Sequence, residues 1–321
     1  MEFPLTPRAG RRQRHGVLIM WFKNLTIARL PADFSLPTLP STLEAALSEH
    51  PLRSPGPLEM ETRGFITPFS RKDAALTHET GNAALFALGT ETRVLPASVL
   101  ADAVAERIAD HEAKTGRKPG NRLRNEFREA ALGELLPRAF IKRARTGAYF
   151  DNESRLLYVD TTSDSAAEAV CTALRDALES FPARPLACEA SLELIMSEWL
   201  ISGELPHGFE LGESVELKDP SDQTSVVRGL HHDLGAEEIR EHARCGKQVT
   251  QLGLIFDGRI GFVLDARLRL RKLRFLDVIS DKLDVHEGAD PDQILDAEFF
   301  LMSGELRILL SELDRVLRFV D

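Results

Sequence analysis

Apolar residues recur along the chain at two spacings, and together they predict an α+β fold with mostly antiparallel sheets and flanking helices. Alternating or short apolar runs predict strands over residues 21–30, 64–69 and 83–88, and a hairpin over 149–159. Helical spacing predicts helices over 41–48, 121–136, 165–178, 234–245 and 304–319, and another from Pro96 to the break at 116–120. A chain of 321 residues with this mixture should form two or three lobes.

Two of these helices combine a narrow apolar face with a polar remainder. The first begins at Pro96 and aligns Val99, Leu100, Ala103, Val104 and Ile108. The second aligns Leu123, Phe127, Ala131 and Leu135, which leaves Arg122, Arg124 and Arg128 on its more exposed sides. Pro137 should end or kink this second helix. A third helix should start at a capping box made by Ser165 and Glu168.

The clearest local signal is a tight hairpin over residues 249–264, with Asp257 and Gly258 at its turn. A third strand over 266–275 should extend it into a meander. Leucines and arginines alternate along this strand, and the phase slips at Lys272, which suggests a bulge. One face of this sheet should therefore be strongly positive, because the strand itself carries no acids. A solvated sheet face is the alternative interpretation.

Composition divides the chain into six expected regions. They are a disordered extension (1–19), an α+β region (20–95), a basic helical region (96–145), a central α+β region (146–202), an acidic connection (203–233) and a C-terminal meander with helices (234–321). The extension is basic but lacks the apolar run of a secretory signal. No apolar run approaches the ~20 residues that cross a bilayer.

Positive charge is concentrated in two short windows of a chain whose net charge is −10. Residues 114–145 contain ten basic residues against three acidic ones, and residues 267–274 contain five basic residues and no acid. Such segregation predicts one surface that faces a polyanion, on a protein that is otherwise acidic.

No motif for catalysis emerges, so we expect neither an enzyme nor a cofactor. The glycines at 116–120 lack the lysine and hydroxyl residue of a phosphate-binding loop. Three cysteines without CxxC spacing favour packing roles in a reducing cytoplasm. His231, His232 and Asp233 are the best metal candidates, with His207 and His242 as further options. Adjacent histidines point apart in most backbones, however, which favours a surface or interface role and predicts no metal site.

Several short segments resemble one known family in the same order from Met20 to the C-terminus. They include Met20-Trp21-Phe22-Lys23-Asn24-Leu25, Leu135-Leu136-Pro137-Arg138-Ala139-Phe140, Lys272-Leu273-Arg274-Phe275 and Met302-Ser303-Gly304-Glu305-Leu306. These segments are similar to the RdgC family of recombination-associated proteins. The resemblance leaves residues 1–19 uncovered, which supports their interpretation as an extension.

This resemblance implies a cytoplasmic, nucleoid-associated protein that binds duplex DNA with little sequence preference. It also implies a ring-shaped homodimer that surrounds DNA and limits the access of the RecA recombinase. Phe140 would lie at one subunit contact, and His231, His232 and Asp233 at the other. The histidines stand where the family has Lys-Gln, so a pH-dependent second contact is a hypothesis. The basic residues expected to contact DNA are Lys114, Arg117, Lys118, Arg122, Arg124, Arg138, Lys142, Arg143, Lys247, Arg267, Arg269, Arg271, Lys272 and Arg274.

Two other functional classes remain open from the sequence alone. A protein-interaction module would use the same basic surface to bind an acidic partner, including the acidic run over 277–298 of a neighbouring copy. A nuclease would need a carboxylate cluster, which we cannot assemble from the sequence. Neither RecA contact nor a preference between duplex and single-stranded DNA can be assigned from the residues.

Overall fold

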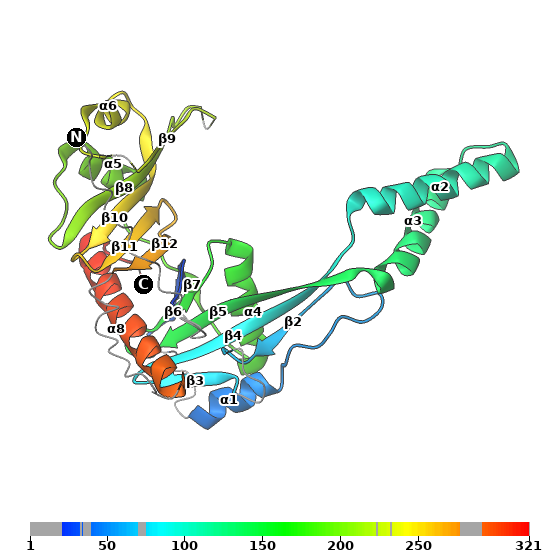
Figure 1. Cartoon of the computed structure of the whole chain (residues 1–321), viewed down its shortest axis with the longest axis horizontal. Coiled ribbons are helices and arrows are strands. Elements are labelled where there is room, and N and C mark those ends of the chain that lie inside the picture. The colour runs from blue at the N-terminus through cyan, green and yellow to red at the C-terminus, as the bar shows by residue number, and fades with distance from the viewer. Residues whose placement is uncertain are drawn as a thin grey trace, which may run out of the picture.

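The computed structural model describes residues 21–32, 34, 40–69, 75–222, 224–231, 233–276 and 291–320. These residues form two antiparallel sheets with flanking helices, which confirms the α+β expectation. Figure 1 shows a curved molecule with the second sheet at one end and a two-helix arm at the other, and the first sheet lies between them. The predicted extension and most of the acidic run lie outside the described residues, as does His232.

The first sheet has the order β2-β4-β5-β6-β1-β7, and β3 pairs with residues 83–86 of β4 on the same edge as β2. Its strands are β1 (Thr26–Arg29), β2 (Glu61–Ile66), β3 (Thr77–Thr80), β4 (Ala83–Val94), β5 (Phe140–Asp151), β6 (Leu156–Val159) and β7 (Arg184–Pro185). Helices α1 (Pro40–Ser48) and α4 (Asp164–Leu178) bury Leu47, Val170 and Leu174 in one core with Phe65 and Phe86. This arrangement confirms the predicted 149–159 hairpin and the 41–48 helix.

Strands β4 and β5 form a long ribbon that extends well beyond β6, β1 and β7, with β2 paired to the outer edge of β4 as far as Thr92. Each has twelve residues, and they pair along their whole length from Ala83↔Asp151 to Val94↔Phe140. The arm at the end of the ribbon consists of α2 (Ala97–Thr115) and α3 (Asn121–Leu135), followed by the short helix η1 (Leu136–Arg138). The Arg93 guanidinium anchors the arm by donating hydrogen bonds to the Leu136 and Pro55 carbonyls, both at 3.1 Å.

The apolar faces of the arm are covered only in part. No residue of α2 is buried, and Ala131 is the buried residue of α3. The two helices pack on each other through contacts such as the His111 and Phe127 rings, whose centroids lie 5.9 Å apart. The predicted stripes therefore form a thin two-helix contact rather than the face of a large core.

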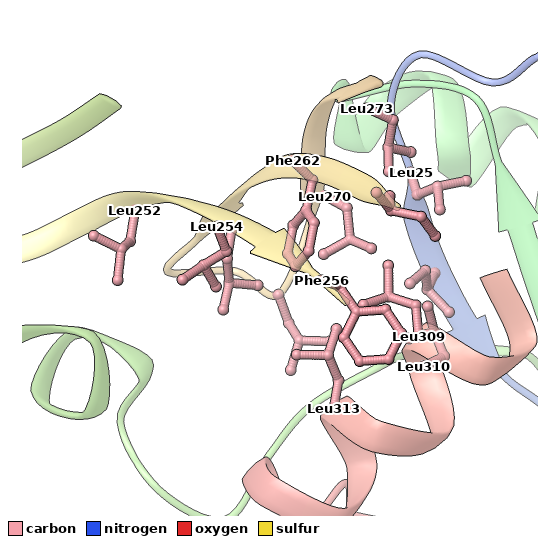
Figure 2. Close-up of a cluster of buried hydrophobic side chains, with 14 of the residues drawn as sticks. Leu25, Leu252, Leu254, Phe256, Phe262, Leu270, Leu273, Leu309, Leu310 and Leu313 are labelled. Atoms are coloured by element: carbon pink, nitrogen blue, oxygen red, sulfur yellow. The ribbon is translucent and has the colours of Figure 1, made fainter. Parts of the chain in front are cut away.

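The second sheet has the order β12-β11-β10-β8-β9. Its strands are β8 (Phe209–Lys218), β9 (Val226–Leu230), β10 (Gln248–Phe256), β11 (Ile260–Asp265) and β12 (Leu270–Phe275). Helices α5 (Leu192–Ser202), α6 (Glu237–Arg244) and α8 (Pro291–Leu317) pack against one face of this sheet. Figure 2 shows Leu309, Leu310 and Leu313 of α8 meeting apolar side chains of the strands. The opposite face, here called the open face, carries the polar and glycine positions.

The chain joins the two sheets through the residues just before β1. Leu25 exchanges backbone hydrogen bonds with Leu270 of β12, at 2.6 and 3.0 Å, before the chain enters the first sheet. The Asp160 carboxylate accepts the backbone N–H groups of Lys23 and Asn24 at 3.0 and 2.9 Å. Burial raises the pKa of Asp160 despite these bonds. The junction is therefore fixed by main-chain pairing and by a partly desolvated carboxylate.

The structure corrects two expected elements in the second half of the chain. Residues 203–233, expected to be an acidic connection, contain β8 and β9, because buried Phe209, Val215 and Leu217 give β8 an apolar face despite its acids. The third strand of the meander begins only at Leu270, since the preceding residues turn and Leu268 has a φ of +59°. A register shift between Gly261 and Val263 and a φ of +51° at Lys272 confirm the predicted bulge.

Helix boundaries differ from expectation at two places. Ser163, rather than Ser165, caps α4, because its hydroxyl accepts the backbone N–H of Ala166 at 3.3 Å. Helix α8 starts at Pro291, well before the predicted residue 304, and so includes the end of the acidic run. Pro137 ends α3 as predicted, with α3 closing at Leu135 and η1 following.

Candidate functional site

The cations of the first window gather in part at the free end of the arm. Lys114 lies in the last turn of α2, Arg117 and Lys118 lie in the connection, and Arg124 lies in α3. All four side chains are exposed, and none forms an ion pair with another described residue. Arg122 has a side chain 95% exposed and pairs with Glu126 at 3.1 Å. Fully solvated cations without fixed partners can be drawn to an approaching anion at little desolvation cost.

Of the remaining cations of this window, Arg128 lies in α3, and the others lie on η1 and β5 and are not brought onto one face. Arg138 of η1 is exposed. Lys142 pairs with Thr92 across the ribbon and Arg143 with Glu91, so the two neighbours point to opposite faces. The Arg143 guanidinium donates to the Glu91 carboxylate at 2.8 Å, and this hydrogen bond lowers the pKa of Glu91. Lys142 is thus the solvated cation of the pair, whereas Arg143 is partly neutralised.

The second window is not the uniformly positive face that the sequence predicted. Arg269 has a side chain only 16% exposed, and it contacts Asp265 at 2.8 Å and Asp164 at 3.1 Å. Arg267 also pairs with Asp164, which belongs to the first turn of α4. The acids that pair with these two arginines therefore come from β11 and from α4, which is distant in the sequence, rather than from the third strand of the meander. Arg267 and Arg269 connect the two lobes of the molecule instead of presenting free charge.

Arg271, Lys272 and Arg274 remain as the unpaired cations of the second window. Their side chains make no ion pair with the described residues, and they line cavities on the open face. Lys247 is held differently, because its ammonium donates to the Ser225 hydroxyl at 2.6 Å. The structure thus separates the predicted DNA-binding residues into an arm cluster, a ribbon, a lobe junction and the open face.

The residues expected at subunit contacts lie at widely separated places. Phe140 is 87% exposed at the base of the arm, beside Val94, which is 45% exposed. His231 has a φ of +55° and lies 3.3 Å from a Glu213 carboxylate oxygen, just after β9. Asp233 accepts the backbone N–H of Gly235 at 2.8 Å. A side chain as large as Phe140 left in solvent is typical of a surface that another molecule covers.

Sequence reasoning missed two apolar residues near this surface. Leu58 and Met60 are 70% and 48% exposed, and the Met60 carbonyl accepts the backbone N–H of Arg93. The sequence feature that could have indicated them is the presence of large apolar side chains in a segment otherwise rich in proline and charged residues. Only the pairing of β2 with β4 places them at the distal end of the ribbon.

No group of three or more His, Cys, Asp or Glu side chains in the described part of the chain is arranged to hold a metal ion. Burial raises the pKa of Cys171 to about 11, which fits its packing in the first core. Among these residues no helix has the length and apolar character to span a membrane.

Two antiparallel sheets, a projecting arm and solvated cations at its end define an α+β protein with a basic surface suited to a polyanion. The chain belongs to the RdgC family of recombination-associated proteins. The family model described as "Putative exonuclease, RdgC" matches residues 20–319. This confirms the resemblance found in the sequence.

Relatives named "Recombination-associated protein RdgC" cover nearly the whole chain. The protein of Xanthomonas campestris pv. campestris (strain B100) is 40% identical over 300 residues, which are 93% of this chain and 98% of the relative. The Xylella fastidiosa (strain 9a5c) protein is 40% identical over 294 residues, or 90% of this chain and 95% of the relative. The Xanthomonas oryzae pv. oryzae (strain MAFF 311018) protein is 39% identical over 300 residues.

Proposed function

We propose that this protein binds duplex DNA with little sequence preference, as a ring-shaped homodimer in the nucleoid that limits the access of RecA to DNA. The observation that carries the proposal is the set of solvated, unpaired cations at the end of the arm, Lys114, Arg117, Lys118 and Arg124. Contacts from such side chains to phosphates supply affinity but no sequence information. The recombination-associated name of the relatives agrees with this proposal.

The curved outline of the subunit supports the ring. The residues expected at the subunit contacts lie well apart along this outline, with Phe140 at the base of the arm and His231 directly after β9 of the second sheet. Two copies that meet at both contacts would enclose a space between them, and a closed dimer satisfies both exposed surfaces without leaving a free end. Such a ring would hold duplex DNA through its basic residues while the acidic remainder of the chain faces outward.

The test is fluorescence anisotropy of several unrelated duplexes at a series of salt concentrations. We expect similar affinities for all sequences, which fall steeply with salt. The variant Arg117→Glu/Lys118→Glu should weaken binding to every duplex and flatten the logarithmic salt slope by about 2, since each phosphate contact contributes about 0.9. The matched control is Arg184→Glu/Arg315→Glu, which reverses two exposed charges outside both windows.

Two results would contradict the proposal. Absence of duplex binding at low salt would mean that the basic windows serve contacts with an acidic protein. Shortened DNA products that require Mg²⁺ or Mn²⁺ and persist in separately purified preparations would establish the exonuclease named in the family description. We propose instead that the protein acts by occupying DNA, without cleaving it and without a cofactor.

A further inference from the structure

A groove crosses the open face of the second sheet. Three cavities of about 290, 440 and 460 Å³ make up this groove and share lining residues from one to the next. Leu230, Val263 and Lys272 line both the first and the second cavity, and Arg271 lines both the second and the third. We call this feature the open-face groove.

Glycines form the floor of the groove at its first cavity. Gly212, Gly253 and Gly261 come from β8, β10 and β11 and replace side chains that would fill the space. A Cβ atom on Gly253 would lie 2.9 Å from the Ser214 carbonyl oxygen, so glycine is required there. A Cβ atom on Gly261 would meet no atom within 4 Å. The hollow is walled by aliphatic side chains, of which Leu230 is 57% exposed.

Unpaired cations lie along the same groove. Arg271, Lys272 and Arg274 form no ion pair with another described residue. Glu216 lies at the centre of the groove, and its negative charge is balanced by neighbouring cations. Burial alone would raise the pKa of this carboxylate, but hydrogen bonds from Arg228, Thr250 and Lys218 outweigh burial and lower it. The groove therefore offers an aliphatic hollow beside three cations without an ion-pair partner among the described residues, although Glu213 also lines the first cavity and Glu193 and Asp219 line the third.

We propose that the open-face groove binds an extended, acidic protein segment that carries one large apolar side chain. The apolar side chain would occupy the glycine-floored hollow, and flanking carboxylates would meet Lys272, Arg274 and Arg271. Charge complementarity selects an acidic occupant, and the aliphatic walls select an apolar anchor. Among the described lining residues the exposed aromatic ring is the His231 imidazole, since Phe262 is buried, so the groove lacks the phenylalanine, tyrosine or tryptophan platform typical of single-stranded nucleic-acid sites. This role goes beyond the proposed binding of duplex DNA, although it uses Arg271, Lys272 and Arg274, which the sequence also predicts to contact DNA, and lies beside His231, which is expected at a subunit contact.

The test uses the full chain and a fluorescein-labelled peptide with one large apolar side chain, Asp-Asp-Asp-Leu-Asp-Asp-Asp. A second peptide has every Asp replaced by Asn. Anisotropy should show binding of the acidic peptide and affinity at least about fivefold lower for its neutral counterpart, since surface ion pairs contribute ~0.2–1 kcal/mol each. Unlabelled duplex DNA and a single-stranded oligo-dT of equal charge are then added as competitors of the labelled peptide. Their effect distinguishes a protein occupant of the groove from a nucleic-acid occupant.

Two variants address the hollow and the charges separately. Gly261→Leu fills the hollow from an extended position with open space around it, and Gly133→Leu is its control on the arm. Lys272→Glu/Arg274→Glu reverses the rim charge. We expect Gly261→Leu and the charge reversal to lose peptide binding, Gly133→Leu to retain it, and Gly261→Leu to keep full affinity for duplex DNA.

Three outcomes would overturn the proposal. Equal affinity for the acidic and neutral peptides would remove the charge selection, and unchanged peptide binding by Gly261→Leu would remove the hollow. If oligo-dT displaces the peptide at lower concentration than unlabelled peptide does, or if Gly261→Leu loses duplex binding in parallel, the groove belongs to a nucleic-acid surface. Melting temperatures equal to that of the unmodified chain would show that each variant is folded.

Discussion

Asp265 organises the turn between β11 and β12. Its carboxylate is 4% exposed and accepts the backbone N–H groups of Arg267 and Arg269 at 2.9 and 3.2 Å. It also accepts the side chain of Arg269 at 2.8 Å. One buried acid thus determines the course of the backbone and withdraws one arginine of the second window from solvent. The number of basic residues in a sequence window is therefore a poor measure of the charge that a ligand meets.

We predict that Asp265→Ala destabilises the protein by about 3 kcal/mol, because it leaves Arg269 largely buried without its nearest carboxylate. Arg267→Ala removes a more exposed pair, with an arginine side chain 69% exposed, and should cost less than about 1 kcal/mol. Urea denaturation followed by circular dichroism measures both values. Equal destabilisation by the two variants would refute the assigned role of Asp265.

At the scale of single elements, the β10–β11 hairpin depends on its turn. Asp257 and Gly258 have φ values of +51° and +63°, and the Arg259 N–H donates to the Phe256 carbonyl at 2.9 Å. A side chain at a left-handed position costs roughly 1 kcal/mol, so Gly258→Ala should lower the free energy of unfolding by about that amount. Gly133→Ala, inside α3, should instead raise it by about 0.5–1 kcal/mol. Opposite signs in denaturant titrations would support this assignment, and a gain from both substitutions would disprove it.

Elements with a strong local signal could be predicted from the sequence. The hairpin at Asp257-Gly258, the helix after Pro96 and the bulge at Lys272 all depend on residues close together in the chain. Strand β8 was missed because its outward positions are acidic and resemble a loop. Their partners, such as Arg228 for Glu216, come from a neighbouring strand that the pattern does not reveal.

The candidate site was predictable in composition but not in arrangement. The basic windows supplied the candidate cations, yet residues 138–145 were expected within a helical region and mostly form a strand, which sends Lys142 and Arg143 to opposite faces. Asp164, which pairs with Arg267 and Arg269, is separated from them by more than one hundred residues. Tertiary packing alone brings this acid to the second window, so no local pattern could have shown it.

For the whole molecule, the exposed aromatic at the base of the arm gives a test of assembly. We predict that Phe140→Asp shifts the protein from dimer toward monomer, since it places a charge where an apolar contact is expected. Sedimentation velocity at several protein concentrations measures the change. The matched control is Phe300→Asp on α8, a phenylalanine 62% exposed at a different place on the molecule.

Four results of this comparison are informative. Loss of the dimer in Phe140→Asp alone supports the arm contact, and loss in both variants points to a general effect of an added charge. A monomeric unmodified chain at micromolar concentration would contradict the ring. A dimer that persists in Phe140→Asp would assign the subunit contact to the other end of the molecule, near His231.

The lengths of β4 and β5 determine how far the arm projects and which way it faces, and side-chain direction in these strands repeats every two residues. Each residue advances a strand by about 3.3 Å and reverses the direction of the next side chain. One residue added to each strand would turn Phe140 and Lys142 to the other side of the ribbon, whereas two added to each would move the arm outward by ~7 Å with its facing unchanged. The arm can therefore project further without rotating only when an even number of residues is added to each strand. Among natural relatives, the width of the space inside the curved subunit should accordingly vary in steps of two residues per strand.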